Sequence, residues 1–366
     1  MIDDFGLERL VSPLLNWYQD NARTLPWRED ATPYRVWVSE IMLQQTRVEA
    51  VKPYFARFMD ALPDAASLAA CPEDQLLKLW EGLGYYNRVR NMQKAAIEVM
   101  EQYDGVLPAD YEKLLKLKGI GSYTAGAIAS IAYGIPVPAV DGNVFRVLTR
   151  VTADDTDIMK ASFRKKVESE LLAMMGKQAG TFSPGAWNQA LMELGATVCL
   201  PNGAPLCEKC PWRGLCLAKA EGRIEELPVR SKTKPRKIEK RTVLVIRDGD
   251  KVAIHKRPKK GLLAGLYELP NVEGELTQEE VLSLVKEMKF APIRIQKLAD
   301  AKHIFSHIEW QMTGYAIRVE EAGFGEREMA EEKLIFVDAT DARERYAIPS
   351  AFAVYAEYMD IRLGIS

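Results

Sequence analysis

Four of the five cysteines lie within residues 199–216, and this crowding strongly constrains how the chain can fold. Cys199, Cys207, Cys210 and Cys216 form the pattern C-x7-C-x2-C-x5-C after the helical stretch NQALMELGATVC. The acidic start, MIDDFGLERL, lacks the features of an export signal, so the crowding favours a metal site over disulfides. Four thiolates suit a structural zinc ion or an iron–sulfur cluster. One compact loop favours a 4Fe–4S cluster, because zinc usually binds two cysteine pairs set well apart, but the spacing leaves both open.

The hydrophobic periodicity changes once along the chain and divides it into two parts. Residues 7–222 carry apolar residues at spacings of three and four, which is typical of helices. After the basic stretch RSKTKPRKIEKR, the sequence TVLVIRDGDKVAIHKR predicts two strands around an Asp-Gly turn. We therefore expect an all-α domain over residues 1–222, a basic linker over 223–241 and an α+β domain over 242–366.

The composition is that of an ordinary folded protein, with 48% hydrophobic and 27% charged residues. A formal net charge of -2 is unusual for a nucleic-acid binder, although the basic stretch at 230–241 concentrates positive charge in one place. Residues 119–140 form an uncharged segment that is long enough to cross a membrane. Glycines and prolines within that segment favour a buried helix flanked by turns instead.

The stretch KGIGSYTAG, at 118–126, contains a Gly-x-Gly turn between two helical patterns. Nucleotide-binding glycine loops follow a strand, so this turn predicts a helix-hairpin-helix over about residues 110–133. Gly119 and Gly121 would let the backbone approach an anion, and a DNA phosphate suits such a site. A plain turn between helices, with glycine as a C-cap, is the alternative.

The hairpin and the four-cysteine loop together resemble the endonuclease III superfamily of DNA glycosylases. Four stretches within this frame resemble the MutY family of adenine DNA glycosylases, namely WVSEIMLQQTRVEAV (37–51), WEGLGYYNRVRN (80–91), KGIGSYTAGAI (118–128) and AVDGNVFRVLTR (139–150). The resemblance extends from about residue 7 to the C-terminus. It implies a multidomain protein with an all-α helix-hairpin-helix glycosylase domain and an α+β, Nudix-like C-terminal domain that recognises the lesion.

The resemblance also implies a cofactor, a substrate and a cellular location. The four clustered cysteines of the chain would hold a 4Fe–4S cluster. Its partner would be double-stranded DNA containing adenine mispaired with 8-oxoguanine or guanine, in base excision repair. We expect a monomer of bacterial, cytoplasmic type, associated with the nucleoid and not with a membrane.

Removal of adenine from DNA requires a flipped-out base, a proton for the leaving base and stabilisation of the positive sugar. The resemblance implies that Glu40 protonates adenine N7, so burial should raise its pKa. It implies that Asp141 stabilises the oxocarbenium ion or forms a covalent intermediate, and that Asn143 orients the water or the aspartate. By position alone, Asp141 would be a helix N-cap, and the two roles can coexist.

Tyr123 stands where lyase members of the superfamily carry a lysine that attacks the sugar. A phenol cannot form the resulting imine, so we expect little or no AP lyase activity. We also expect the Tyr123 hydroxyl to orient Asp141.

Further matches imply contacts with DNA in the helical domain. Gln45 would push into the base stack, and Tyr85 would wedge beside 8-oxoguanine. Trp27, Arg28 and Gln189 would line the adenine pocket. Without the resemblance, Gln45 would be an exposed helix residue and Tyr85 a loop-packing aromatic.

In the C-terminal domain, Phe305, Ser306 and His307 match the family loop that probes 8-oxoguanine. Alone, this tripeptide would be an unremarkable turn. The helical stretch LTQEEVLSLVKEMK lacks the glutamate array of a Nudix hydrolase, so we expect no pyrophosphate hydrolysis.

The cysteine loop departs from the family pattern. Its first spacing is seven residues instead of six, and LPNGAPL carries no charge where the family loop is typically basic. We expect the cluster to form while this loop adds little affinity for DNA. The basic linker, Arg88, Arg90 and the hairpin amides would then supply the phosphate contacts.

Three other functions compete with an adenine glycosylase. They are an endonuclease III-like bifunctional glycosylase and lyase, a catalytically silent DNA-binding protein, and a Nudix phosphohydrolase with a DNA-binding appendage. Glu40 argues against the first, because the endonuclease III branch carries no glutamate there. The two carboxylates argue against the second, and the missing glutamate array argues against the third.

Overall fold

The computed structural model describes residues 5–231, 235–320, 327–329 and 332–359, and its chain forms two compact units. The first unit comprises Met1–Ala70 and Arg90–Lys232, and the second comprises Cys71–Val89 and Thr233–Ser366. The division after residue 232 falls inside the segment expected to be a linker. The hydrophobic pattern did not indicate that residues 71–89 pack with the C-terminal part of the chain. The predicted limits at 222 and 242 stay a prediction.

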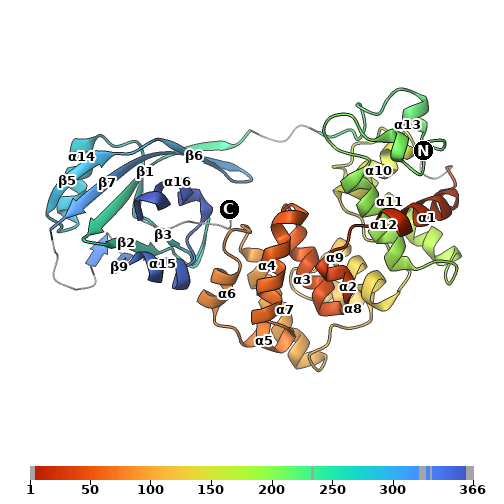
Figure 1. Ribbon diagram of the computed structural model, residues 1–366, viewed down its shortest axis with the longest axis horizontal. Coiled ribbons are helices and arrows are strands. Elements are labelled where there is room, and N and C mark those ends of the chain that lie inside the picture. The colour runs from red at the N-terminus through yellow and green to blue at the C-terminus, as the bar shows by residue number, and fades with distance from the viewer. Residues whose placement is uncertain (1–4, 232–234, 321–326, 330–331, 360–366) are drawn as a thin grey trace. The chain divides into compact units, whose positions relative to one another are not determined.

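The first unit is helical, as the periodicity predicted (Figure 1). Its helices begin and end as follows: η2 (Leu7–Leu10), α1 (Val11–Asn21), α2 (Pro26–Glu29), α3 (Pro33–Leu43), α4 (Val48–Ala61), α5 (Ala65–Ala70), α7 (Asn87–Gln102), α8 (Tyr111–Lys116), α9 (Ser122–Ala127), η3 (Ile128–Ala132), α10 (Gly142–Val151), α11 (Ala161–Lys177), α12 (Pro184–Thr197), η4 (Cys207–Lys209) and α13 (Leu217–Ala220). The first three residues of α7, up to Val89, belong to the second unit.

Helices α10 and α12 lie at the centre of one core of this unit. Residues 144–151 of α10 are all buried, and Trp187 of α12 packs against Trp212 with ring centroids 6.5 Å apart. Gly195 allows the two helices to approach closely, because a Cβ there would lie 2.6 Å from Cβ of Asn143. Each fully buried aliphatic or aromatic side chain contributes about 1.5–3 kcal/mol. This packing holds the start of α10 in a fixed position against α12.

The Gly-x-Gly turn joins α8 to α9, so the expected hairpin between two helices is confirmed. Gly119 adopts a φ of 82°, which favours glycine, and a Cβ there would lie 2.7 Å from Cβ of Asn91. Ile120 is buried between the two glycines. Helix α9 continues into the π-helical turn η3. Gly126 of α9 lies so close to the carbonyl oxygen of Pro138 that a Cβ would be 2.1 Å from it.

The second unit is an α+β structure, as expected. Its strands form one sheet in the order β5-β7-β1-β2-β9-β8, with β3 paired to β2, β4 to β1 and β6 to β7. The strands are β1 (Lys237–Asp248), β2 (Lys251–Lys256), β3 (Tyr267–Glu268), β4 (Asn271–Glu273), β5 (Pro292–Lys297), β6 (Ala301–Ile304), β7 (Ile308–Val319), β8 (Arg327–Met329) and β9 (Glu332–Val337). Strands β1 and β7 are parallel and the other pairs are antiparallel. Strand β1 therefore begins inside the segment expected to be a linker.

Helices cover both faces of this sheet (Figure 1). The helical elements of the second unit are α6 (Glu73–Leu79), α14 (Gln278–Glu287), α15 (Ala339–Arg345), η5 (Ser350–Phe352), α16 (Ala353–Ala356) and η6 (Glu357–Met359). Because side chains alternate along a strand, Val243 and Val245 of β1 pack on the side of η5 and α16, whereas Leu244 and Ile246 pack on the side of α14. The predicted Asp-Gly hairpin is present, with Asp248 opposite Lys251.

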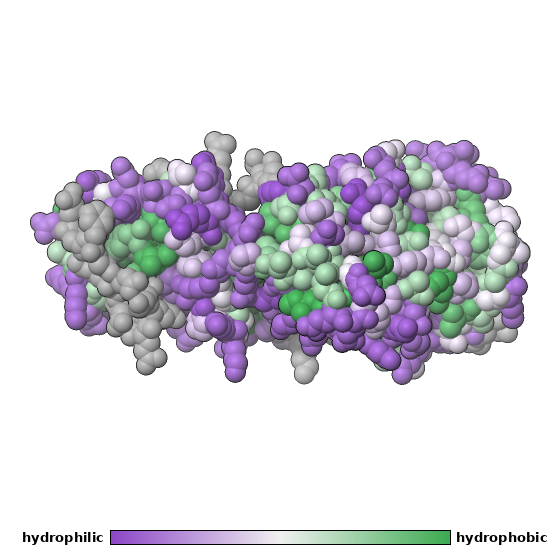
Figure 2. All heavy atoms as spheres, turned by 90° about the horizontal axis from the view of Figure 1, so that it is seen from below, coloured by the Kyte–Doolittle hydropathy of each residue, from purple (hydrophilic) through white to green (hydrophobic). Residues whose placement is uncertain are grey.

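Within the residues that the structure describes, no helix is both long and apolar enough to span a bilayer. The face shown in Figure 2 is largely hydrophilic, with hydrophobic patches interrupted by polar residues. The uncharged stretch at 119–140 contributes to a buried hairpin instead.

Candidate active site and cysteine pocket

A cleft of about 1140 Å³ in the first unit brings together eight residues that the sequence singled out. They come from five separate parts of the chain: Trp27, Arg28, Glu40, Gln45, Tyr123, Asp141, Asn143 and Gln189. Leu25, Val36 and Val140 supply apolar walls. The cleft therefore combines buried carboxyl groups with a partly apolar lining, which is the environment that shifts carboxyl pKa values.

Glu40 lies in the last turns of α3 and is only 6% exposed. The helix is started by Thr32, whose side chain accepts a hydrogen bond from the Arg35 amide, with Pro33 at its first position. Burial raises the pKa of Glu40 from 4.5 to about 7, against the hydrogen bond from Tyr123, which lowers it. The carboxyl group is therefore poised to hold and give up a proton near neutral pH.

Asp141 is the N-cap of α10, as its position suggested. Its Oδ1 accepts a hydrogen bond of 2.8 Å from the Val144 amide, and its Oδ2 accepts one of 2.7 Å from Asn143 Nδ2. Burial raises the pKa of Asp141, while these hydrogen bonds favour the ionised form. Capping thus fixes the direction of a carboxylate that also lines the cleft.

The Tyr123 hydroxyl has a different partner from the one we expected. It donates a hydrogen bond to Oε2 of Glu40, and not to Asp141, and it lies 3.4 Å from Met192 Sδ. Burial, together with the nearby carboxyl groups, raises the pKa of Tyr123 well above 10. The phenol therefore remains a hydrogen-bond donor, and it orients the first carboxyl group instead of the second.

A buried ion-pair network beside the adenine-pocket residues escaped the sequence analysis. Glu193 of α12 accepts hydrogen bonds from Arg23 Nε at 2.6 Å and from Arg28 Nη2 at 2.8 Å. Burial alone would raise the pKa of Glu193, but the two arginines lower it overall. Arg28 also stacks on Tyr18, whose hydroxyl contacts Gln189 at 3.4 Å. The only sequence signal was a glutamate inside an otherwise apolar helical stretch.

Two residues expected to enter the DNA adopt left-handed backbone conformations. Gln45 has a φ of 64° and follows the end of α3, and Tyr85 has a φ of 47°. Both side chains are exposed. Such conformations are uncommon for residues other than glycine and often occur where a ligand binds.

The predicted lesion-probing residues lie in the second unit. Phe305 packs against Trp310 with ring centroids 4.9 Å apart, so it anchors the β6–β7 turn. Ser306 and His307 are the exposed residues at its tip. Ser306 Oγ donates a hydrogen bond of 3.1 Å to the hydroxyl of Tyr85, which joins two of the predicted 8-oxoguanine contacts.

Arg88 does not present its guanidinium to solvent as a phosphate ligand would. Its Nη2 donates to the carbonyl oxygens of Leu83 and Gly84, at 2.9 and 3.1 Å, and burial lowers its pKa to about 10. Arg88 instead holds the loop that carries Tyr85. The expectation that Arg88 supplies affinity for DNA stays a prediction.

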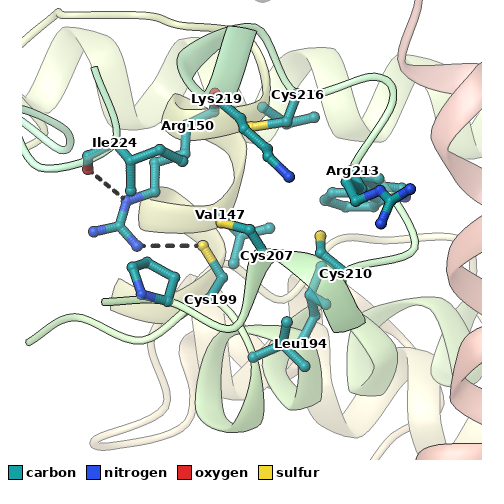
Figure 3. Close-up of a pocket in the computed structure, with 14 residues that line it drawn as sticks. Val147, Arg150, Leu194, Cys199, Cys207, Cys210, Arg213, Cys216, Lys219 and Ile224 are labelled. Atoms are coloured by element: carbon teal, nitrogen blue, oxygen red, sulfur yellow. Dashed lines mark hydrogen bonds between the residues drawn. The ribbon is translucent and has the colours of Figure 1, made fainter. Parts of the chain in front are cut away.

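The four clustered cysteines line one pocket, and Figure 3 shows their side chains around a common space. The pocket has an apolar lining that includes Val147, Leu194 and Trp212. Burial raises the pKa of Cys210 to about 12, so a bound cation would be needed to hold this group as a thiolate. Among the described side chains, no three His, Cys, Asp or Glu groups converge tightly enough to bind a single metal ion. The donor set and the dry lining fit an iron–sulfur cluster.

Two arginines of α10 contact the first cysteine, and one of them, Arg146, also connects this pocket to the cleft. Arg146 donates to Oδ1 of Asn143 at 2.9 Å and to the carbonyl oxygen of Cys199 at 2.8 Å. Arg150 donates to Sγ of Cys199 at 3.4 Å and to the carbonyl oxygen of Leu200 at 2.8 Å. The position of the first cysteine is thus tied to Asn143, which in turn holds Asp141.

Comparison with known proteins agrees with this geometry. Residues 38–172 match the HhH-GPD superfamily of base excision DNA repair proteins, and residues 242–358 match the NUDIX domain. The chain is 34% identical to the adenine DNA glycosylase of Mus musculus, with 95% of this chain and 78% of that protein covered. The chain belongs to the adenine DNA glycosylase family.

Other members and a solved structure extend the comparison. The adenine DNA glycosylase of Buchnera aphidicola (subsp. Acyrthosiphon pisum, strain APS) is also 34% identical, with 84% of this chain and 85% of that protein covered. The structure of a thermostable thymine-DNA glycosylase is 25% identical with a TM-score of 0.51, covering 58% of this chain and 96% of the other. The resemblance to this family, inferred from four sequence stretches, is confirmed.

The buried Glu40 of this family member should make stability depend on pH. Because its pKa is raised from 4.5 to about 7, the stabilisation is complete below pH 4.5 and is lost as the pH rises through 7. Glu40→Gln removes this loss, so the free energy of unfolding of the variant relative to wild type should increase between pH 5 and pH 8 by up to about 3 kcal/mol. Thermal and urea unfolding at both pH values measure this difference.

Glu49→Gln is the matched control, since Glu49 borders the same cleft but its side chain is 76% exposed. A Glu40→Gln difference that is the same at pH 5 and pH 8 would contradict the burial of a titrating carboxyl group.

Proposed function

We propose that this protein is a monofunctional adenine DNA glycosylase that excises adenine mispaired with 8-oxoguanine or guanine during base excision repair. The observation that carries the proposal is a pair of buried carboxyl groups, Glu40 and Asp141, facing one cleft with different surroundings. Relatives named adenine DNA glycosylase support the choice of base. Different environments for two carboxyl groups are the usual basis of acid and base assignments in such sites.

Glu40 serves as the general acid in this proposal. Its carboxyl group gives a proton to N7 of the flipped-out adenine, and the base then leaves with the electron pair of the glycosidic bond. Water adds to the sugar carbon and releases a proton, which Glu40 takes up. The hydrogen bond from Tyr123 to Oε2 holds the carboxyl group while its proton moves.

Asp141 stabilises the positive charge that develops on the sugar, either as a neighbouring carboxylate or through a covalent bond. Its hydrogen bonds from the Val144 amide and Asn143 oppose the rise in pKa that burial causes, and they fix the direction of the carboxylate. Such preorganised negative charge is worth more inside a partly apolar cleft than in water.

The residue pattern around Glu40 disfavours a lyase reaction. Tyr123 has no amine and keeps its proton, so it cannot form an imine with the sugar. Its hydroxyl is engaged by Glu40. The proposed enzyme therefore leaves an abasic site and does not cut the strand.

Recognition of the opposite base is assigned to residues of the second unit. Tyr85, Ser306 and His307 are exposed, and the first two are hydrogen-bonded to each other. The Ser306 hydroxyl can donate to or accept from the altered edge of 8-oxoguanine. Gln45 and the hairpin glycines Gly119 and Gly121 would contact the DNA from the first unit.

Cys199, Cys207, Cys210 and Cys216 would hold a 4Fe–4S cluster with a structural role. A cluster places one cysteine on each iron, and four thiols around one apolar pocket suit that arrangement. Bound there, the cluster would cross-link the loop at 199–216. Arg146, which is hydrogen-bonded to both Cys199 and Asn143, would then help to hold Asn143 and Asp141 in place.

The cofactor is tested by metal analysis of protein purified without oxygen. We expect roughly four irons per chain, and Cys210→Ser should lose them. Cys71→Ser is the matched control, because Cys71 lies outside the pocket, and it should retain the iron. About one zinc per chain with no iron would show that the pocket is a zinc site.

The reaction is tested with duplexes that contain adenine opposite 8-oxoguanine, adenine opposite guanine or, separately, thymine glycol. We expect adenine release from the first two, with strand breaks appearing only after alkali treatment. Glu40→Gln should slow the release by at least about a hundredfold, as is usual when a general acid is removed. Nicking of the thymine glycol duplex without alkali would identify an endonuclease III-like lyase instead. Inertness toward all three would indicate a DNA-binding protein without activity.

A further inference from the structure

A mostly buried ion pair in the second unit, Lys78–Glu81, is hydrogen-bonded to the main chain that follows helix α15. Lys78 Nζ lies 2.6 Å from Oε2 of Glu81, and the two side chains are only 17% and 15% exposed. Lys78 also donates to the carbonyl oxygen of Tyr346 at 2.9 Å. Glu81 Oε1 accepts a hydrogen bond of 2.7 Å from the amide of Ile348. Both charges are thus satisfied by each other and by the main chain.

The chemistry of this contact suits a firm attachment. Lys78 places an ammonium group at the C-terminal end of α15, where the carbonyl oxygens of a helix carry partial negative charge. Glu81 meets an amide of the residue Ile348, whose side chain is fully buried. An exposed ion pair contributes little to stability, but removing one partner of a mostly buried, hydrogen-bonded pair takes from the other the charge that compensates its burial.

The attachment lies at the base of the loop that carries Tyr85. Trp80 Nε1 donates to the carbonyl oxygen of Gly84 at 3.1 Å, and Arg88 donates to the same carbonyl and to that of Leu83. Leu83 N in turn donates to the Trp80 carbonyl oxygen at 3.1 Å. These bonds make residues 80–88 an internally braced loop, so the position of its base fixes the position of its tip.

The tip of the loop has a much weaker attachment. Tyr85 is 48% exposed and accepts a hydrogen bond from Ser306 in the β6–β7 turn. A solvent-exposed bond between two hydroxyl groups contributes little to stability. The alignment of Tyr85 with Ser306 therefore depends on the buried contact at the base.

We propose that Lys78 and Glu81 are positioning residues for lesion recognition. They hold the Tyr85 loop against the β6–β7 turn, so that Tyr85 and Ser306 meet 8-oxoguanine as one preformed surface. This inference rests on the proposed function, since it concerns how the enzyme distinguishes 8-oxoguanine from guanine. Neither residue touches the cleft that contains Glu40.

The test is the ratio of the single-turnover rate constants for adenine release opposite 8-oxoguanine and opposite guanine. In Lys78→Met and in Glu81→Gln this ratio should fall about tenfold, as expected for the loss of one charged hydrogen bond. Lys78→Arg, which keeps the positive charge, should retain most of the wild-type ratio. The double variant Lys78→Met/Ser306→Ala should show a smaller fall than the product of the two single falls, because both changes act on the same alignment.

Asp74→Asn is the matched control. Asp74 lies one turn before Lys78 on α6 and pairs with Lys256 at 2.5 Å, but both side chains are nearly half exposed. This variant should keep the wild-type ratio. A similar fall in Asp74→Asn and Lys78→Met would mean that any loss of charge on α6 has this effect, and it would overturn the proposal.

Hydrogen exchange measured on the same variants separates the possible failures. In Lys78→Met, exchange should accelerate in the peptides that cover residues 73–88 and 339–350, while those covering α10 stay at wild-type rates. Unchanged exchange together with an unchanged ratio would overturn the inference and leave the proposed function intact. A wild-type protein that releases no adenine at all would overturn the proposed function first.

Discussion

Burial of the Glu40 carboxyl group is the constraint on which the candidate site depends. Removing this group from water raises its pKa to about 7, and the surrounding elements serve to maintain that environment. Helix α3 carries the group, α9 supplies the Tyr123 hydroxyl that meets it, and Val36 and Val140 line the cleft around it. The same burial that makes the proton available near pH 7 costs stability when the group is ionised, so the proposed catalytic function and the pH dependence of folding share one cause.

The second carboxylate is held by a chain of contacts that extends to the cysteine pocket. Asp141 caps α10, Asn143 donates to Asp141, and Arg146 connects Asn143 to the Cys199 carbonyl oxygen. Gly195 makes this possible, because only a residue without Cβ lets α12 approach Asn143 so closely. The loop that carries Cys199 is thereby connected to the direction of the Asp141 carboxylate.

Local patterns in the sequence predicted the fold and much of the cleft. The change from helical to strand periodicity, the glycine turn and the Asp141 cap depend on neighbouring residues, and the structure bears out each of them. What the sequence could not show were contacts between distant segments. Tyr123 meets Glu40 and not Asp141, and Glu193 pairs with two arginines from the N-terminal region, because helix packing decides these partners. Residues 71–89 joined the second unit for the same reason.

The most direct test of this account is the pKa of Glu40 itself in the free protein. Carbon-13 NMR of selectively labelled glutamate side chains, with Glu40→Gln used to assign the resonance, follows the carboxyl group through a pH titration. The account predicts a midpoint near 7, the value that burial gives this group. A midpoint near 4.5, the ordinary value for glutamate, would mean that the carboxyl group is solvated and would contradict its role as a proton donor at neutral pH.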